Sequence, residues 1–236
     1  MTGGISHLIL ASVAFVGGHM VLSTKPVRDP IVGKLGEGPF LGLYSLLMAA
    51  ALAWMILAFN AAPYHEVWFA PTAVKHLSLS LLIPACIFIV ASLTPKSPTA
   101  ATGHPPDLSG GPKGIFRITR HPMMWGIGVW ALLHLAANGD AASIIFFGAM
   151  ALLALLGPIL IDRRRARLLG ADWDAFAAQT SYIPFAAILA RRTPENWREI
   201  GWFPVLAGIG LYVVILILHE SLFGVAPLSW VSGILS

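Results

Sequence analysis

Histidines are the ionisable side chains that lie inside the hydrophobic stretches of this sequence. Residues 5–23 contain no Asp, Glu, Lys or Arg but include His19, and residues 123–138 likewise include only His134. An ionisable group in a low-dielectric environment is unfavourable, so its presence predicts a functional site. Neutral imidazoles in an apolar helical bundle favour a metal centre, with haem iron as the first candidate. The alternative is that each ring makes a structural hydrogen bond across helices.

The other histidines occupy less apolar surroundings. His76 and His219 lie near the ends of two apolar runs, and for His219 an interfacial position is the better interpretation. The rise of about 1.5 Å per residue along a helix gives the expected depth of each histidine in the membrane. By depth alone, His134 would share a metal with His76 or His219, and His19 with His121. Three further histidines are expected at the solvated surface: His7, His65 and His104.

The tripeptide Arg120-His121-Pro122 predicts a polar cluster at a helix start. Proline suits the first helical turn, where its missing N–H needs no partner. A helix amino terminus also attracts anions, so a phosphate, propionate or carboxylate is expected to be favoured there. The alternative is a helix cap whose arginine extends to the membrane surface.

The composition indicates an integral membrane protein. Of 236 residues, 57% are hydrophobic and 11% are charged, against about a quarter charged in soluble domains. The net charge of +4 does not indicate nucleic acid, because the basic residues fall in short loops. The single cysteine, Cys86, excludes an internal disulfide and a cysteine-based zinc site.

The hydrophobic runs predict an all-α, polytopic membrane bundle of about six helices, forming one domain over residues 1–236. A span needs about 20 apolar residues. The candidates are 5–23, 40–60, 73–94, 122–138, 141–161 and 201–219. Only Asn138-Gly139-Asp140 separates the fourth from the fifth, which predicts an antiparallel hairpin. The first is expected to be a retained span, not a cleaved signal peptide.

The basic residues predict the orientation. Three alternate loops hold fourteen of the fifteen Lys and Arg residues, leaving Lys75 on the other side. Because cytoplasmic loops are enriched in Lys and Arg, both termini are expected to be periplasmic in a bacterial inner membrane.

Two of the basic loops differ in character. Residues 95–114 are rich in Pro, Gly and Ser and predict a flexible connection. Residues 162–198 predict an amphipathic segment on the membrane surface, with helical spacing over 171–178 and arginines that meet anionic lipid headgroups.

Three motifs together resemble the NnrU family, which includes the 15-cis-ζ-carotene isomerases of plants and cyanobacteria. These are Ile118-Thr119-Arg120-His121-Pro122-Met123-Met124 continuing to Trp130 and His134, then Asp162-Arg163-Arg164, then residues 180–188 (TSYIPFAAI). The resemblance implies a membrane haem b protein with redox or isomerase-like activity, a lipophilic substrate, or a link to denitrification and nitric oxide metabolism.

The resemblance also implies roles for individual residues. His19 and His134 match the histidines implicated as haem axial ligands in the isomerase. Arg120, Arg163 or Arg164 would then pair with haem propionates or with the polar end of a substrate. One departure is Ala131, which stands where the isomerase has a cysteine three residues before the second histidine. A ligand exchange between cysteine and histidine is therefore not expected here.

Two alternatives stay open from the sequence. One is a non-catalytic accessory or sensor of nitrite and nitric oxide respiration. The other is an S-adenosylmethionine-dependent membrane methyltransferase, since those enzymes share the Arg-His-Pro motif; here, however, Ile161-Asp162 replaces their Glu-Glu pair.

Overall fold

The computed structural model describes residues 4–93, 98–99 and 108–228, and over these ranges it is an all-helical protein with one isolated β-bridge. His104 and Lys96 lie outside the described residues, as does most of the predicted 95–114 connection. The long helices are α1 (Ile5–Leu22), α3 (Glu37–Asn60), α4 (Thr72–Leu93), α6 (Pro122–Ala137), α7 (Ala141–Leu169) and α10 (Trp202–Phe223). The shorter helices are α2 (Lys25–Leu35), α5 (Ile115–Ile118), α8 (Ala171–Gln179), α9 (Ala186–Leu189) and η1 (Trp197–Glu199).

Five of the long helices could cross a membrane by length and composition: α1, α3, α4, α7 and α10. The chain is therefore an integral membrane protein, as its composition predicted. The remaining predicted span, 122–138, is an apolar helix too, but this helix, α6, has only 16 residues. At about 1.5 Å per residue it is roughly 24 Å long, shorter than a bilayer core of about 30 Å.

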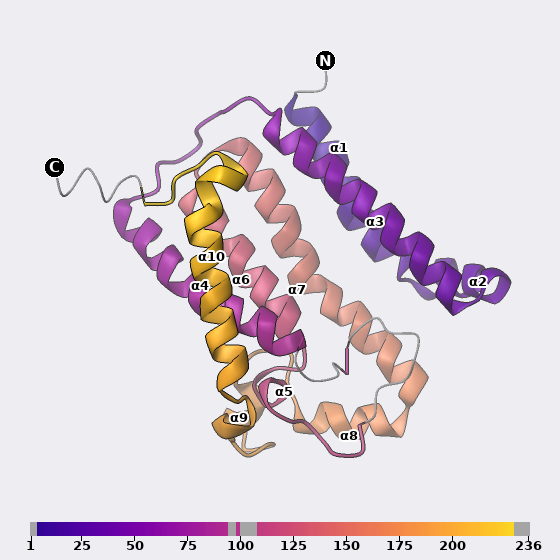
Figure 1. Ribbon diagram of the computed structural model, residues 1–236. Helices are drawn as coiled ribbons and strands as arrows, with labels where there is room; N and C mark the ends of the chain where they lie inside the picture. Colours follow the sequence, from indigo (N-terminus) through magenta and orange to yellow (C-terminus); the bar gives the residue numbers. More distant parts are fainter. Residues whose placement is uncertain (1–3, 94–97, 100–107, 229–236) are drawn as a thin grey trace.

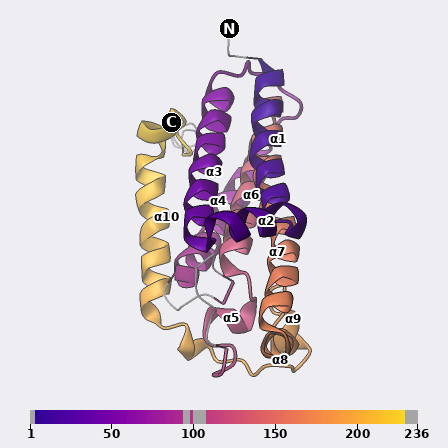
Figure 2. The same ribbon diagram turned by 90° about the vertical axis from the view of Figure 1, so that its right-hand side faces the viewer.

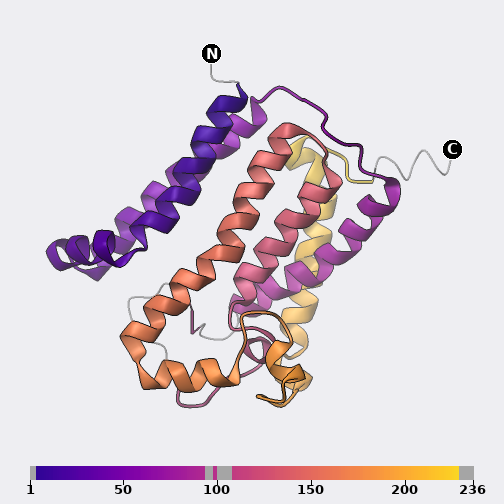
Figure 3. The same cartoon turned by 180° about the vertical axis from the view of Figure 1, so that it is seen from behind.

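The long helices pack in a chain of neighbours. Helix α1 lies beside α3 and packs against α7, which packs against α6; α6 in turn packs against α4, and α4 against α10. The helices α2, α5, α8 and α9 lie at one end of this bundle, while α1 begins and α10 ends at the other (Figures 1 and 3). Turning the molecule shows α1 and α3 side by side, with α10 on the opposite flank (Figure 2).

The end that carries α2, α5 and α8 also carries the arginines and lysines of residues 25–34, 113–120 and 163–198, and is called the basic end below. The basic loops thus share one end of the bundle, as their alternation along the sequence predicted. Which side of a membrane this end faces remains a prediction.

The largest apolar core lies between α1, α3 and α7. It includes Leu8 and Phe15 of α1, Met55 of α3, and Phe146 and Phe147 of α7. Many apolar side chains point outward instead, such as Ile217 at 72% exposure. Apolar side chains on the outside suit a lipid environment, because lipid tails are as apolar as the side chains and do not drive them into the core.

Two glycines let neighbouring helices approach α4 closely. A Cβ added at Gly126 of α6 would lie 2.9 Å from the carbonyl oxygen of Ala85, and one at Gly208 of α10 would lie 2.6 Å from Cα of Ile87. Helix α4 is therefore held from two sides at the same level. Small residues at such crossings are the usual way that membrane helices pack.

The predicted hairpin between α6 and α7 is confirmed. The carbonyl of Gly139 accepts hydrogen bonds from the amides of Val67 and Trp68, and the amide of Ala141 donates to the carbonyl of His65. Asp140 caps α7 by accepting from the amide of Ser143. These bonds tie the hairpin to the segment between α3 and α4.

The segment between the first two predicted spans was expected to be a loop, but it contains α2. Pro26 lies at the start of this helix, where proline is tolerated, and Pro30 lies inside it. Gly36, with φ of 85°, ends α2 and precedes α3. This left-handed backbone favours glycine and brings Glu37 back toward Arg28, with which it forms an ion pair.

Candidate functional site

A cluster of charged groups lies at the basic end, where α6 begins. The Nε2 atom of His121 is 2.7 Å from Oδ1 of Asp162, and Arg120 donates from Nε and Nη2 to Oδ2 at 2.8 and 2.6 Å. One carboxylate on α7 thus accepts from both residues that precede Pro122. Because bonds of this kind are charge-assisted, they fix the start of α6 against α7.

The backbone of residues 181–182 holds the chain around this cluster. The amide of Arg120 donates to the carbonyl of Ser181, and the hydroxyl of Thr119 donates to the carbonyl of Tyr182 at 2.6 Å. The indole of Trp125 donates to the same Tyr182 carbonyl at 2.8 Å. The three motifs that carried the family resemblance therefore meet at one place.

His121 is the most enclosed member of the cluster. The residue is 1% exposed, and among the described residues its Nδ1 atom is buried with no hydrogen-bond partner. The ring of Tyr182 lies edge-on to it at 6.1 Å. Burial, and secondarily the nearby carboxylate of Asp162, raise the pKa of Tyr182, so this phenol stays protonated and donates to the carbonyl of Leu155.

His19 lies in the last turn of α1, near the basic end. Its Nδ1 atom is 2.9 Å from the carbonyl of Phe15, one turn earlier. Its ring makes edge contacts with Phe15 at 4.6 Å and with Tyr44 of α3 at 5.6 Å.

His134 has the same local geometry in α6. Its Nδ1 atom is 2.9 Å from the carbonyl of Trp130, again one turn earlier. Its ring stacks on Phe147 of α7 at 4.9 Å and lies 4.9 Å from the ring of Trp130. Trp130 also packs against the apolar core that contains Phe15.

The donor chemistry of each ring would suit the binding of haem iron. An imidazole whose Nδ1–H is held by a backbone carbonyl keeps its Nε2 lone pair free, which is the arrangement of most metal-bound histidines. The helix directions place His19 and His134 toward opposite ends of the bundle (Figure 1). In this arrangement the two rings do not face a common site, so the structure offers each of them as a separate candidate ligand. Both ligand assignments stay predictions.

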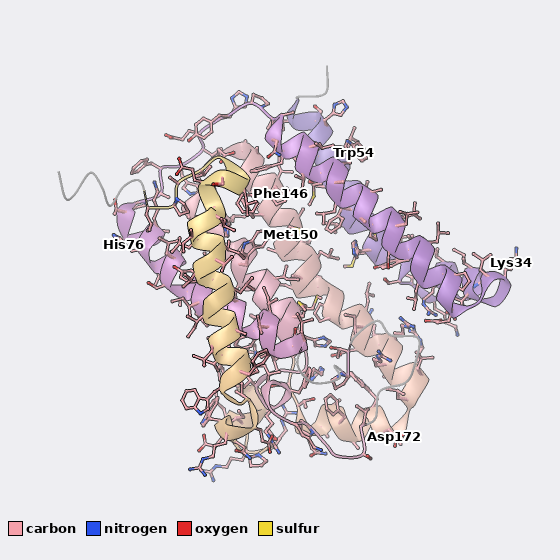
Figure 4. All side chains as sticks on the ribbon, in the orientation of Figure 1. Lys34, Trp54, His76, Phe146, Met150 and Asp172 are labelled. Atoms are coloured by element: carbon pink, nitrogen blue, oxygen red, sulfur yellow. The ribbon has the colours of Figure 1, made fainter. Side chains whose placement is uncertain are left out.

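The remaining predicted site residues lie elsewhere. His76 is exposed at the end of α4 that is remote from α5 (Figure 4). The Nδ1 atom of His219 lies 2.8 Å from the carbonyl of Val225. Arg163 is exposed, and Arg164 donates to Glu37 at 3.0 Å. Over the described ranges, no three His, Cys, Asp or Glu residues form a metal-binding group.

Two residues of the charged cluster were missed as site residues in the sequence. Asp162 was treated only as part of a motif, although an acid directly before Arg163, at the end of an apolar run, indicated a partner for a buried base. Tyr182 gave no such signal, because its role depends on backbone pairing between segments about 60 residues apart.

The fold and these sites define an all-helical membrane protein with histidines inside its helices and a buried charge cluster at its basic end. The sequence profile described as "NnrU protein" matches residues 7–227, and the chain belongs to the NnrU family. The resemblance found in the three motifs is thereby confirmed.

Two curated relatives share part of the chain. It is 38% identical over 116 residues to a 15-cis-ζ-carotene isomerase of Arabidopsis thaliana, covering 47% of this chain and 31% of that protein. It is 34% identical over 88 residues to the Zea mays isomerase, covering 36% of this chain and 24% of that protein. The matched part is thus a third or less of each relative. No solved structure matches the chain significantly.

Proposed function

We propose that this protein is a membrane isomerase that acts on a lipophilic polyene and uses haem b, located in a bacterial inner membrane. The observation that carries the proposal is the match to the NnrU family over residues 7–227. Within this match, the Nδ1 atoms of His19 and His134 each lie 2.9 Å from a carbonyl one turn earlier, which leaves Nε2 of each ring free. The similarity to two carotene isomerases supports the substrate class.

Different residues of this chain would bind the iron and keep water away from it. His134 would hold the iron through Nε2, with Trp130 and Phe147 excluding water from its imidazole, and His19 is the second candidate ligand. When bound, haem supplies an iron centre that exchanges electron density with a polyene and so lowers its double-bond rotation barrier. A dry, apolar site sets the potential of such an iron.

The charged cluster would act as a positioning device. Asp162 neutralises Arg120 and binds His121, so these groups are already engaged with one another and fix where α6 starts. His134 follows on the same helix, and its depth depends on that start. Arg120 would therefore pair with a haem propionate only by leaving Asp162.

Ala131 limits the chemistry. It is fully buried in α6, one turn before His134. No cysteine thiolate is available at this position, so any haem held here would lack the exchange between cysteine and histidine ligands that the resemblance implies for the isomerase.

The test is conversion of 15-cis-ζ-carotene in bacterial cells that accumulate it. Expression of the chain should convert this isomer to the form in which the 15-cis double bond has become trans, resolved by chromatography, and His134→Ala should abolish conversion. His65→Ala, an exposed loop histidine, is the matched control and should convert normally. Full expression of the protein in the membrane without any conversion would refute the isomerase.

The same purified protein separates the alternatives. Binding of nitric oxide to the reduced protein without polyene conversion would favour a sensor or accessory role in denitrification. Micromolar binding of S-adenosylmethionine by calorimetry would favour methyl transfer at the Arg120-His121-Pro122 end.

A further inference from the structure

A basic cavity of about 210 Å³ lies between the α1–α2 turn and the last turns of α7. Ser23 and Leu168 line it together with one carboxylate, Asp29. Its other lining residues are four cations: Lys25, Arg28, Arg164 and Arg167. The cavity is separate from the His121–Asp162 cluster and has no part in the proposed function.

The cations of this cavity exceed the carboxylates around them. Glu37 is shared, because it pairs with Arg28 and accepts from Arg164 at 3.0 Å. Asp29 lies 4.0 Å from the guanidinium of Arg28. Two carboxylates therefore face four cations, which leaves two positive charges in and around one small cavity.

Arg28 is held in place and is only partly satisfied. The residue is 8% exposed, and its guanidinium lies 5.1 Å from the centre of the Phe40 ring. In the described part of the chain, the Nε atoms of Arg28 and Arg164 are both buried with no hydrogen-bond partner. A buried cation with unmatched donors is unfavourable unless an anion joins it.

The position and lining of the cavity indicate which kind of anion it would bind. It lies at the basic end, where the membrane-length helices α1 and α7 finish, and lipid headgroups are expected at the ends of such helices. The first turn of α2 lines it with Lys25, and a helix amino terminus carries partial positive charge. Leu168, 60% exposed, offers an apolar surface beside the charges.

We infer that this cavity binds the phosphate of an anionic phospholipid, with the glycerol and acyl chains passing beside Leu168. The four cations and the Ser23 hydroxyl would surround the phosphate oxygens. Arginine suits this role because its planar fork of donors matches phosphate.

The test is native mass spectrometry of the whole protein with phosphatidylglycerol or phosphatidylcholine added in the same detergent. Phosphatidylglycerol should be retained preferentially, and Lys25→Gln or Arg167→Gln should each weaken its binding by about 5-fold, the value of one surface cation near anionic lipid. Lys34→Gln is the matched control, since Lys34 lies on α2 but outside the cavity; it should leave the binding unchanged.

Three results would overturn the inference. The first is equal retention of the two lipids, and the second is an equal loss of phosphatidylglycerol binding in Lys34→Gln. The third is that inorganic phosphate raises the melting temperature of the protein as much as phosphatidylglycerol does. The last would assign the cavity to a soluble phosphate compound. The haem spectrum tests the proposed function, and lipid retention tests this cavity, so failure of one proposal can be distinguished from failure of the other.

Discussion

The Nε2 atom of His121 lies 2.7 Å from Oδ1 of Asp162, although 41 residues separate the two in the chain. This contact joins the residue before α6 to the last third of the long helix α7. The same carboxylate also binds Arg120. One side chain therefore sets where the fourth apolar helix begins, and with it the depth of His134.

Asp162→Ala should destabilise the protein. His121 is buried, so it would lose its acceptor without gaining water, and Arg120 would lose its partner. Leaving such groups unpaired costs about 2 kcal/mol, which corresponds to a melting temperature lower by about 5 °C. Thermal unfolding in detergent measures this change. Glu220→Ala, an exposed acid on α10, is the control, and equal melting of the two variants would show that the cluster is not structural.

Gly208→Ala should loosen the packing of α10 on α4. The added Cβ would meet the backbone of Ile87 at 2.6 Å, and the backbone cannot rotate away. Overpacking of this kind costs about 1–3 kcal/mol. Gly210→Ala tests the same helix and the same added methyl group, but nothing lies within 4 Å of its Cβ. We expect a lower melting temperature for the first variant and no decrease for the second; similar melting of both would contradict the close crossing.

The ion pair between Arg117 and Glu199 should make stability depend on pH. Hydrogen bonds from Arg117, then from the Gly114 amide, lower the pKa of Glu199 from 4.5 to about 2. A carboxylate with a lowered pKa stabilises the folded state above its unfolded pKa, and this contribution disappears as the group is protonated. The contribution should thus be complete above pH 4.5 and be lost between pH 4.5 and 2.

Melting temperatures at pH 7, 4.5 and 3 measure this effect. Glu199→Gln should lower stability at pH 7 and flatten part of the acid dependence, whereas Glu195→Gln, at an exposed neighbouring acid, should leave the profile unchanged. An unchanged profile for Glu199→Gln would mean that the pair does not hold α5 to the segment before α10.

The membrane helices could be predicted from the sequence because hydrophobicity is a local property. The predicted span 141–161 and the observed α7 share their first residue, Ala141, and the structure extends the helix to Leu169 because its arginines can continue it beyond the apolar core. Helix α2 was missed because residues 25–34 were assigned to a loop as the basic segment between two apolar runs, although Pro26 lies where a helix tolerates proline.

The charged cluster was only partly predictable, for a different reason. The Arg120-His121-Pro122 motif indicated a polar helix start, but no local pattern reveals that Asp162 meets it. That contact depends on which faces of α6 and α7 pack together. Likewise, the arginine candidates could not be distinguished by type: Arg164 joins Glu37 and Arg28 instead of a histidine site.

The optical absorption spectrum of the detergent-purified protein, expressed with ample haem, tests the central claim most directly. We expect a Soret band that shifts on reduction, is lost in His134→Ala and is lost or displaced in His19→Ala, and persists in His65→Ala. A Soret band that survives in both ligand variants would contradict the assignment of the two rings, and the absence of any Soret band in the unmodified protein would contradict the account of a haem-dependent enzyme.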